Sequence, residues 1–477
     1  MKWVRSLYEF VFGEDPIERK KVLLLGFSFF AAIGSYTLAK ELKDSIFMSV
    51  VGYEYLPEAK FWSIFVLIPL VFVYSRIVDV LKRHQVLMLM ATVYAVGGLI
   101  FAFYFGHPTI GLPNTDTGRG RLFGWAFYFF VEGYSPFLVS VIWAFVNSVM
   151  KPDSVKSSYL ALTALKLLGG VVTAFLAWGF LTLQCSHCVE VSDVASYQIL
   201  MIFAALLLSL IPLLCAILVR VVPKDRLHGY EKAYQYEKHQ EEEHVKASGF
   251  VPVVRDLLHG MFSGVYVLVR YPYVFGIFLL SFFWEVVNVS FNYVRLGVGQ
   301  TVAAGSVTKL GAYLYGQIFF VQLAGFLVVL LGARALVERL GIRRTLMTVP
   351  LITGGMILAY LWLDGFLSIG VTYIIMRSIN YGVAGPLRES LYIPTTKATK
   401  FKAKTWIDGF GAKLAKASGS GYNIFTAYVL RNAFVSEFAL HSVFFGGIVA
   451  VWTVVASLMG QTYERTISRG SVIGADE

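Results

Sequence analysis

Residues 380–420 read NYGVAGPLRESLYIPTTKATKFKAKTWIDGFGAKLAKASGS. The stretch leaves one apolar segment, crosses a turn rich in lysine, and enters a second apolar segment that still carries charge. Its charged residues are Arg388, Glu389, Lys397, Lys400, Lys402, Lys404, Asp408, Lys413 and Lys416. A lysine in the hydrocarbon region of a membrane is costly to insert, so it normally faces a wet cavity or a charged partner. We therefore expect this stretch to contribute to a binding site for an anion.

The composition of the whole chain is that of a membrane protein. Of its 477 residues, 57% are hydrophobic and only 15% are charged, which excludes an ordinary soluble globule. A helix rises about 1.5 Å per residue, so roughly 20 apolar residues cross a hydrocarbon core about 30 Å thick. Apolar runs that suit a span occupy residues 22–39, 61–80, 86–105, 122–149, 159–183, 199–219, 273–291, 312–331, 345–362, 367–385, 407–430 and 443–458. These runs predict about twelve membrane spans, divided equally by a polar central stretch.

Two short loops point to a duplicated fold. The loop after the eighth predicted span reads GARALVERLGIRR (residues 332–344), and the loop after the second reads RIVDVLKR (residues 76–83). The first resembles the short acidic and basic loop of the major facilitator superfamily, and the second is a weaker copy. Ordinary anchoring of basic residues at the membrane interface is the alternative. Transporters with related halves hold their substrate near the midplane. We predict an all-α polytopic membrane protein with about twelve transmembrane helices in two six-helix, major-facilitator-like halves.

The predicted organisation has five parts. Residues 1–21 are a cytoplasmic N-terminal segment, 22–222 the first six-helix half, 223–260 a charged cytoplasmic linker, 261–460 the second six-helix half, and 461–477 a cytoplasmic tail. The linker contains His239 and His244, which do not share a helical face, so we predict no metal site there. Cys185 and Cys188 lie in a predicted outward loop, where they form either a local disulfide or two unpaired thiols. Cys215 is expected to be apolar filler.

The placement of lysine and arginine sets the expected orientation. These residues favour cytoplasmic loops, and they are dense in the loops that lie inside if the N-terminus is cytoplasmic. We therefore expect a multi-pass protein of the cell inner (cytoplasmic) membrane with both termini in the cytoplasm. The formal net charge of +11 mostly reflects this asymmetry, so no nucleic-acid partner is predicted. No cleavable targeting segment is expected, because the first 21 residues are not acid-poor and the first apolar run can span the membrane.

Several ionisable residues lie deep inside the predicted spans. Counting the rise along each helix places Glu132 and Glu285 roughly 15–18 Å deep, near the membrane midplane. Arg377 and Lys416 come out at a similar depth, and Lys166 lies shallower. Four charged residues close the outer end of the first span: Lys40, Glu41, Lys43 and Asp44.

Two interpretations of these charges stay open. Each charge can belong to a structural ion pair between helices, because buried charges usually pair. Taken together, the cations are what a polyphosphate needs, and the acids could pair with them when the cavity is empty. The same spans also contain aromatic residues that could stack on a base: Trp125, Tyr128, Trp284, Phe291 and Tyr293.

The 380–420 stretch resembles the signature of the ATP/ADP exchangers of obligate intracellular bacteria and plastids, the nucleotide transporter family. The matching residues are Tyr381, Pro386, Glu389, Tyr392, Ile393, Pro394, Lys400, Lys402, Lys404, Ile407, Asp408, Gly411, Leu414, Lys416, Gly419 and Ser420. Residues 40–45 (KELKDS) are similar to the family's RDTKDT. The region that contains Glu132, Trp143, Phe145 and Asn147 resembles its fourth span, and Glu285 stands where the family carries a seventh-span glutamate.

The resemblance implies a membrane transporter for nucleotides, with ATP/ADP exchange as the first expectation, that works by alternating access around a site between the two halves. It implies that Lys43, Glu132, Glu285 and a lysine of the 404–416 segment are essential for transport. Lys43 and Lys416 would bind phosphates, and the glutamates would pair with cations during the switch. The expected substrate-binding residues are Lys40, Lys43, Asp44, Glu132, Lys166, Glu285, Arg377, Arg388, Lys404, Asp408 and Lys416.

The chain departs from the family pattern at several positions. Lys40 and Glu41 replace an Arg-Asp pair, Gly385 replaces an aspartate, and Arg388 replaces a lysine. A proton-coupled importer of other nucleotides, or of another phosphorylated or organic anion, therefore stays open as an alternative. The chain has no Walker-type loop, H-E-x-x-H or clear nucleophile–base motif, so we predict no enzyme activity and no cofactor or metal. The expected partners are the nucleotide substrate (ATP, ADP or another nucleoside triphosphate) and membrane lipid, and we expect a monomer.

Overall fold

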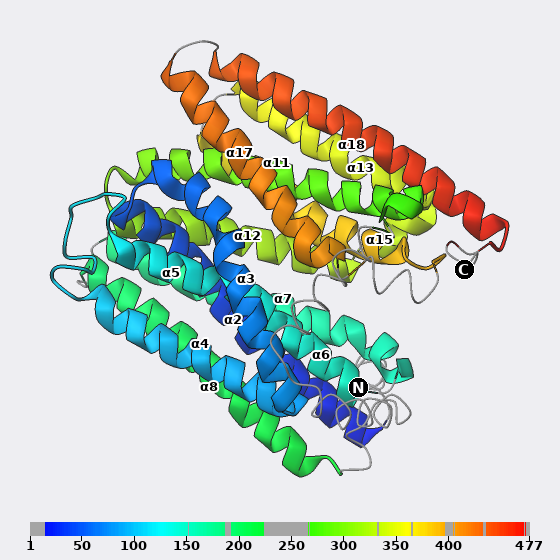
Figure 1. The fold of residues 1–477 in the computed structure, drawn as a ribbon, viewed down its shortest axis with the longest axis horizontal. Helices are drawn as coiled ribbons and strands as arrows, with labels where there is room; N and C mark the ends of the chain where they lie inside the picture. The colour runs from blue at the N-terminus through cyan, green and yellow to red at the C-terminus, as the bar shows by residue number, and fades with distance from the viewer. Residues whose placement is uncertain are drawn as a thin grey trace. The chain divides into compact units, whose positions relative to one another are not determined.

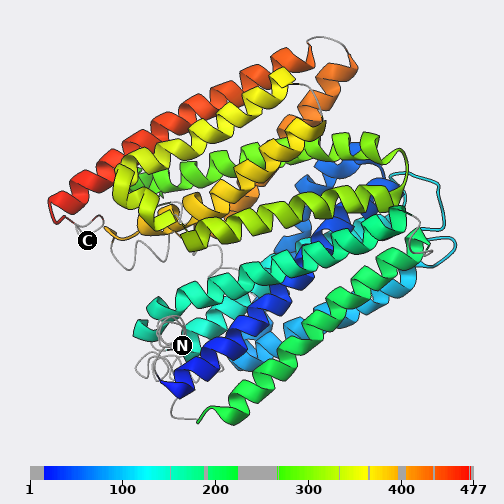
Figure 2. The same cartoon turned by 180° about the vertical axis from the view of Figure 1, so that it is seen from behind.

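The computed structural model describes residues 15–150, 152–186, 192–223, 266, 268–331, 333–363, 366–395, 404, 406–432, 436–471 and 473. Within these ranges the chain is almost entirely helical (Figures 1 and 2), and the β structure is limited to an isolated bridge between Thr395 and Ile473. This confirms the predicted all-α fold class.

The helical elements follow one another along the whole chain. The first part of the chain contains α2 (Pro16–Val50), η1 (Tyr53–Tyr55), α3 (Leu56–Val80), α4 (Arg83–Phe105), α5 (Leu122–Glu132), η2 (Ser135–Val139), α6 (Ser140–Val149), α7 (Pro152–Cys185) and α8 (Asp193–Val221). The later part contains α11 (Pro272–Ala303), α12 (Val307–Leu331), α13 (Ala333–Leu363), α14 (Phe366–Ile379), η4 (Asn380–Ala384), α15 (Gly385–Ser390), η5 (Ile407–Gly411), α17 (Ala412–Arg431) and α18 (Glu437–Ser468).

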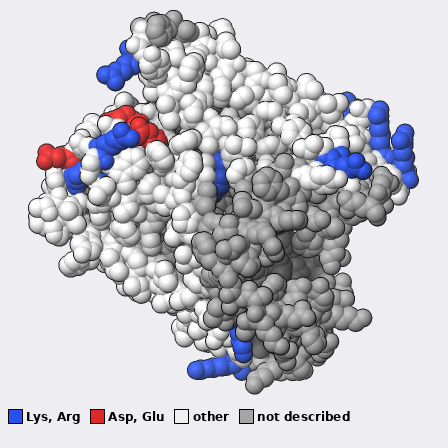
Figure 3. Space-filling model, in the orientation of Figure 1, with Lys and Arg blue, Asp and Glu red and all other residues white. Residues whose placement is uncertain are grey.

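Among the described residues, nine helical segments are long and apolar enough to cross a membrane. The three other predicted spans, residues 61–80, 367–385 and 407–430, coincide with α3, with α14 and η4, and with η5 and α17. All three are helical, but they are not among the nine, so the number twelve stays a prediction. The broad uncharged surface visible in Figure 3 is what helices present when they face lipid.

Residue contacts divide the chain into two compact units. Unit 1 comprises Met1–Tyr53, Val66–Gly249 and Ala303–Leu323, and unit 2 comprises Glu54–Phe65, Phe250–Val302 and Ala324–Glu477. The division runs through α3 and α12, so each of these helices contributes a segment to both units. The predicted half boundaries at 22–222 and 261–460 stay predictions. The predicted linker lies outside the described residues from residue 224 onward.

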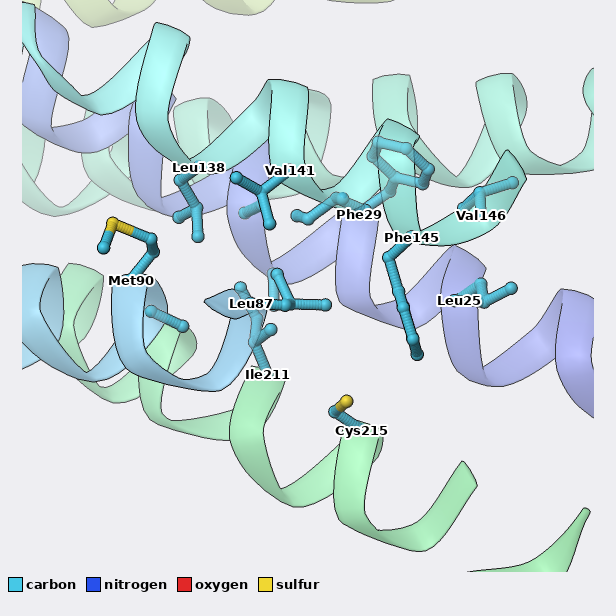
Figure 4. Close-up of a cluster of buried hydrophobic side chains, with 14 of the residues drawn as sticks. Leu25, Phe29, Leu87, Met90, Leu138, Val141, Phe145, Val146, Ile211 and Cys215 are labelled. Atoms are coloured by element: carbon cyan, nitrogen blue, oxygen red, sulfur yellow. The ribbon is translucent and has the colours of Figure 1, made fainter. Parts of the chain in front are cut away.

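The core of unit 1 packs around α2. Apolar side chains from α2, α4, α6 and α8 interlock there (Figure 4), among them Leu25, Phe29, Leu87, Phe145 and Ile211. Glycine lets α2 and α7 approach closely, because a Cβ at Gly169 would collide with the backbone of Phe30. Cys215 is 2% exposed and belongs to the same core, which confirms the prediction that it is apolar filler.

In unit 2, α13 and α18 lie side by side in both ribbon views. Gly341 has a φ of 75°, which glycine adopts without strain, and it separates a short helix from the spanning part of α13. Just after this turn, the backbone N–H of Arg343 donates to Glu464 Oε1 at 3.1 Å, and its guanidinium donates to Ser457 Oγ at 3.1 Å. These contacts anchor the C-terminal end of the predicted 332–344 loop to α18.

Three predicted spans contain a π-helical turn that hydrophobic periodicity did not predict. The turns η2, η4 and η5 lie in predicted spans four, ten and eleven. Single π turns inside α-helices frequently occur at functional sites. Each turn here is close in sequence to expected binding residues, namely Glu132 for η2, Arg377 and Arg388 for η4, and Asp408 for η5.

Candidate functional site

In unit 1 the structure brings Lys43 and Glu132 together. The Lys43 ammonium donates to Glu132 Oε1 at 2.5 Å and lies 3.4 Å from Asp44 Oδ1. It also lies 4.3 Å from the centroid of the Tyr128 ring. Lys43 is only 4% exposed. Two carboxylates and an aromatic face therefore offset the cost of burying this ammonium group.

The local fold explains why α5 delivers both Tyr128 and Glu132 to Lys43. The two residues are four apart in a helix, so their side chains share one face. Phe47 of α2 packs against that face, with its ring centroid 5.0 Å from that of Tyr128 and 5.1 Å from that of Trp125. Trp125 and Tyr128, which the sequence suggested for base stacking, are thus engaged in packing between α2 and α5.

Two other expected cations of unit 1 lie in different surroundings. Lys40 donates to Glu41 at 2.8 Å, and the Glu41 side chain is 1% exposed. Lys166 of α7 is half-buried. No ion pair within 4 Å joins Lys166 to any carboxylate that the structure describes, so its place in the site stays a prediction.

In unit 2 the polar network is centred on Arg377 of α14. Its Nη1 donates to Asn288 Oδ1 at 2.7 Å, and its Nη2 donates to the Tyr381 hydroxyl at 2.7 Å. The Asn288 side chain in turn donates to Glu285 Oε2 at 3.3 Å. An amide therefore bridges the expected glutamate and the expected arginine, whereas in unit 1 glutamate and lysine touch directly.

A second arginine, which the sequence reasoning missed, lies in the same unit. Arg295 of α11 is fully buried, with its guanidinium carbon 4.0 Å from the centroid of the Tyr373 ring. Its Nε donates to Asn292 Oδ1 at 3.1 Å. The guanidinium of Arg377 lies 5.6 Å from the same Tyr373 centroid and 5.2 Å from that of Tyr381.

The signal that could have found these residues is a polar stripe on α11. Glu285, Asn288, Asn292 and Arg295 follow one another at intervals of three or four residues, so they share one helical face. The depth of a charge along its helix is a property of that residue alone, so it does not reveal the amides or the second arginine on the same helical face.

The expected residue Lys416 lies half-buried on α17, as does Lys413. This helix approaches α11 closely, because a Cβ at Gly419 would lie 3.0 Å from the Val286 carbonyl oxygen. The Ser290 hydroxyl donates to the Gly419 carbonyl oxygen at 3.4 Å. The lysines of α17 and the polar stripe of α11 thus belong to two packed helices of one unit.

The remaining expected residues follow the η4 turn. Arg388 Nη1 donates to Ser281 Oγ at 3.3 Å. Lys404 pairs with Glu389 at 2.5 Å, but both side chains are exposed, so the pair contributes little stability. Burial raises the pKa of the Tyr392 hydroxyl far above its usual value, so that this group stays neutral beside Lys404. Asp408 is exposed in η5. Lys397, Lys400, Lys402, Cys188, His239 and His244 lie outside the described residues.

A small cavity of about 20 Å³ lies within unit 2. It is lined by Leu280, Trp284, Leu346, Val349, Asn380, Ala384, Arg388 and Trp452. The buried Asn380 Oδ1 has no hydrogen-bond partner among the described residues. A cavity of this volume accommodates a water molecule and not a nucleobase. Trp284, another residue suggested for base stacking, packs against Trp452 with ring centroids 6.4 Å apart.

Comparison with known proteins locates similar sequences in both parts of the chain. A family model described as TLC ATP/ADP transporter matches residues 2–114 and 349–463. The chain is 20% identical to ADP,ATP carrier protein 1 of Rickettsia conorii over an alignment 518 positions long, gaps included, which covers 98% of each protein. It is 23% identical over 201 residues to ADP,ATP carrier protein 1 of Rickettsia bellii. That alignment covers 38% of this chain and 40% of the relative.

Among solved structures, the fold is similar to that of a D-xylose-proton symporter. The TM-score is 0.58 at 12% sequence identity, and the match covers 93% of this chain and 96% of the symporter. At this low identity the similarity concerns the fold, and it confirms the predicted major-facilitator-like class.

Proposed function

Because this chain belongs to the TLC ATP/ADP transporter family, we propose that it transports nucleotides across a membrane by alternating access and exchanges ATP for ADP. Its relatives named above are ADP,ATP carriers. The substrate pair comes from those relatives, and the charged clusters inside the helices support it physically.

The observation that carries the proposal is a set of cations buried among apolar helices in both units. Lys43 is 4% exposed and Arg377 is partly buried, at positions where cations normally serve a ligand or a partner. A nucleotide brings several negative charges on its phosphates. Arg377 can bind a phosphate oxygen in place of Asn288 and Tyr381, which now accept its hydrogen bonds.

The carboxylates have a separate role in this proposal. Glu132 neutralises Lys43 while no substrate is bound, which keeps the empty transporter free of an uncompensated buried charge. Arrival of a phosphate changes the partner of the cation. A ligand that binds one conformation better than the other shifts the population between them, and that is the requirement of alternating access.

The proposal also covers the membrane in which the protein lies, the side on which its termini lie, and its oligomeric state. The basic residues of the predicted inward loops support an inner-membrane location with both termini in the cytoplasm. We expect the protein to act as a monomer surrounded by lipid. The nucleotide crosses the membrane chemically unchanged, so the protein is a carrier and not an enzyme.

The test is an uptake assay in intact bacteria that express the protein. Radiolabelled ATP uptake is measured with cells preloaded with ADP and with cells depleted of it. Exchange requires uptake to depend on the preload, whereas a proton-coupled importer works without preload and loses activity when the proton gradient is dissipated. Unlabelled organic anions without phosphate serve as competitors, and competition by them but not by nucleotides would reject a nucleotide substrate.

A further inference from the structure

Arginines gather in unit 2 where α13 begins and α18 ends. Residues 333–344 and 457–470 contain six arginines, two glutamates and no lysine, so their net charge is +4. In the shared orientation of Figures 1 and 3, basic side chains appear where α18 ends. Basic residues beside a membrane span are expected from topology alone. The choice of arginine is more specific, because a guanidinium binds two phosphate oxygens at once, whereas an ammonium acts as a point charge.

The packing of α13 on α18 brings these two stretches together. A Cβ at Gly460 would collide with the backbone of Arg343, and the Arg343 guanidinium donates to Ser457 Oγ at 3.1 Å. Arg344 directly follows this contact on α13, and Arg465 follows little more than one turn after it on α18. The two arginines therefore lie at the same end of one helix pair.

The side chains of four arginines at this end are exposed. They are Arg339, Arg344, Arg465 and Arg469, here called the arginine patch. No ion pair within 4 Å joins any of the four to a carboxylate that the structure describes. Glu464, the carboxylate next to Arg465 in the chain, instead accepts from the backbone N–H of Arg343. The patch therefore presents positive charge to the surroundings of the helix pair.

The position of the patch along the helices corresponds to the level of lipid headgroups. The 32 residues of α18 extend about 48 Å, whereas the hydrocarbon core is about 30 Å thick. The apolar run of α18 ends at Leu458, so Arg465 lies about 10 Å beyond it along the helix. Its long side chain can extend back toward the membrane. Arg344 directly precedes the apolar run 345–362 of α13.

An exposed apolar stripe leads to the patch on each helix. The stripes comprise Val454 and Leu458 on α18, and Leu351 and Leu358 on α13. Their exposed fractions lie between 43% and 59%. Successive members, including Arg465 and Arg344 at the ends, are four or seven residues apart, so each stripe shares one helical face with its arginine. An acyl chain can pack along such a stripe while the phosphate to which it is attached reaches the arginine.

We propose that the arginine patch is a binding site for an anionic phospholipid. Arg344 and Arg465 hold the phosphate, and the acyl chains lie along the stripes. A zwitterionic lipid carries an ammonium group that offsets its phosphate, so a patch of net positive charge favours a lipid of net negative charge. The bound lipid contacts both α13 and α18 and so holds their ends together. This inference does not depend on which substrate the protein carries.

The test measures lipid binding to the purified protein in detergent. Native mass spectrometry gives apparent dissociation constants for phosphatidylglycerol and for phosphatidylcholine, and the parent should prefer phosphatidylglycerol. In the double variant Arg344→Gln, Arg465→Gln, the affinity for phosphatidylglycerol should fall about thirtyfold. That factor corresponds to about 2 kcal/mol, because each basic residue near an anionic surface contributes about 1 kcal/mol. The affinity for phosphatidylcholine should change much less.

Two other double variants separate this site from a general effect of charge. Arg220→Gln with Arg431→Gln removes the same charge from exposed arginines in the last turns of α8 and α17. As the matched control, it should bind phosphatidylglycerol within about twofold of the parent. Arg344→Lys with Arg465→Lys keeps the charge but loses bidentate binding, so its affinity should fall about fivefold.

Equal affinity of the parent for the two lipids overturns the inference, and so does a glutamine variant of the patch that binds phosphatidylglycerol as tightly as the control does. Displacement of bound phosphatidylglycerol by an excess of inorganic phosphate identifies a site for free phosphate and overturns the assignment to lipid. If the glutamine variant does not reach the membrane, the lysine variant decides. Weaker binding than in the parent supports the site, and unchanged binding overturns it.

Discussion

In unit 1 a buried lysine contacts a carboxylate directly, whereas in unit 2 a half-buried arginine contacts an amide and a phenol. Lys43 of unit 1 pairs with Glu132 and lies beside Asp44, and Lys40 pairs separately with Glu41. In unit 2, the buried and half-buried charged residues of α11, α14 and α17 are Arg295, Arg377, Lys413, Lys416 and Glu285. A phosphate must break a direct ion pair to reach Lys43, whereas at Arg377 it would take the place of the amide and the phenol that now accept hydrogen bonds from the guanidinium. The difference suggests that unit 2 receives the phosphates first and that unit 1 holds the pair whose opening accompanies the conformational change.

The largest effect is expected from Lys43→Gln. The substitution leaves the Glu132 carboxylate without its ammonium partner, and breaking a buried ion pair in this way costs about 3–5 kcal/mol. Nucleotide uptake per transporter should fall about a hundredfold, because the phosphate loses a charge-assisted hydrogen bond worth up to about 3 kcal/mol and each 1.4 kcal/mol corresponds to about a factor of ten. Uptake is measured per transporter, with the amount in the membrane determined by immunoblot, and Lys20→Gln at an exposed position of α2 is the control.

The double variant Lys43→Gln, Glu132→Gln sharpens this result. It removes both charges, so it should insert and fold better than the single variant if the pair is important for stability. Transport should stay low, because the phosphate has lost its cation. Recovery of transport by the double variant would show that the pair is structural only.

A change of about tenfold in the apparent substrate constant is expected when Arg377 of unit 2 is given a direct carboxylate partner, as Lys43 of unit 1 has. Asn288→Asp places a carboxylate where the amide oxygen now accepts from Arg377 at 2.7 Å, and it is combined with Glu285→Gln so that the new carboxylate does not face the Glu285 carboxylate, to which the amide now donates at 3.3 Å. The new ion pair competes with phosphate, so the apparent substrate constant should rise about tenfold, as the greater strength of charge-assisted hydrogen bonds implies. Competition assays measure it, with Asn432→Asp at an exposed position as the control. An unchanged constant would remove Arg377 from the phosphate site.

Substitution of the two glutamates should reduce turnover to different extents, because only one of them contacts its cation directly. Glu132 touches its cation directly and Glu285 acts through Asn288, so Glu132→Gln should reduce turnover more than Glu285→Gln does. In both variants the loss of turnover should exceed the loss of substrate binding, because the pairs bias conformations and do not hold phosphate. Binding and transport are measured on the same purified variant, with Glu54→Gln as an exposed control. A loss confined to binding would contradict this role.

The smallest effect is expected at Gly385, where the family resemblance predicts an aspartate. The backbone permits a side chain, because the residue has a φ of −59° and a Cβ would lie 3.4 Å from the Asn380 carbonyl oxygen. Lys404 already pairs with Glu389, so a new carboxylate mainly affects Arg388. Gly385→Asp should raise the apparent substrate constant about twofold at low ionic strength, and salt should abolish the difference by screening over about 10 Å. Gly385→Ala separates backbone from charge, and equal constants for parent and Gly385→Asp at every salt concentration would show that position 385 has no electrostatic role.

The all-helical membrane fold and the transporter class could be predicted from the sequence. The number of consecutive apolar residues determines whether a segment can cross the membrane, because a helix has a constant rise per residue and a bilayer has a nearly constant thickness. The charged 380–420 stretch and the six residues from Lys40 carry the family resemblance, which the comparisons confirm. These are local properties, so each can be evaluated without knowledge of which helices are neighbours.

Which charges meet was decided by the tertiary structure. Lys43 and Glu132 are 89 residues apart, and so are Asn288 and Arg377. Counting rise along a helix gives the depth of a side chain but not the direction it faces or the helix opposite. The π turns η2 and η4 add to this uncertainty, because an inserted residue rotates the side chains that follow it relative to those before. The sequence therefore predicted a membrane helix bundle with buried charge, and helix packing determined that unit 1 buries an ion pair while unit 2 places two arginines on one tyrosine ring.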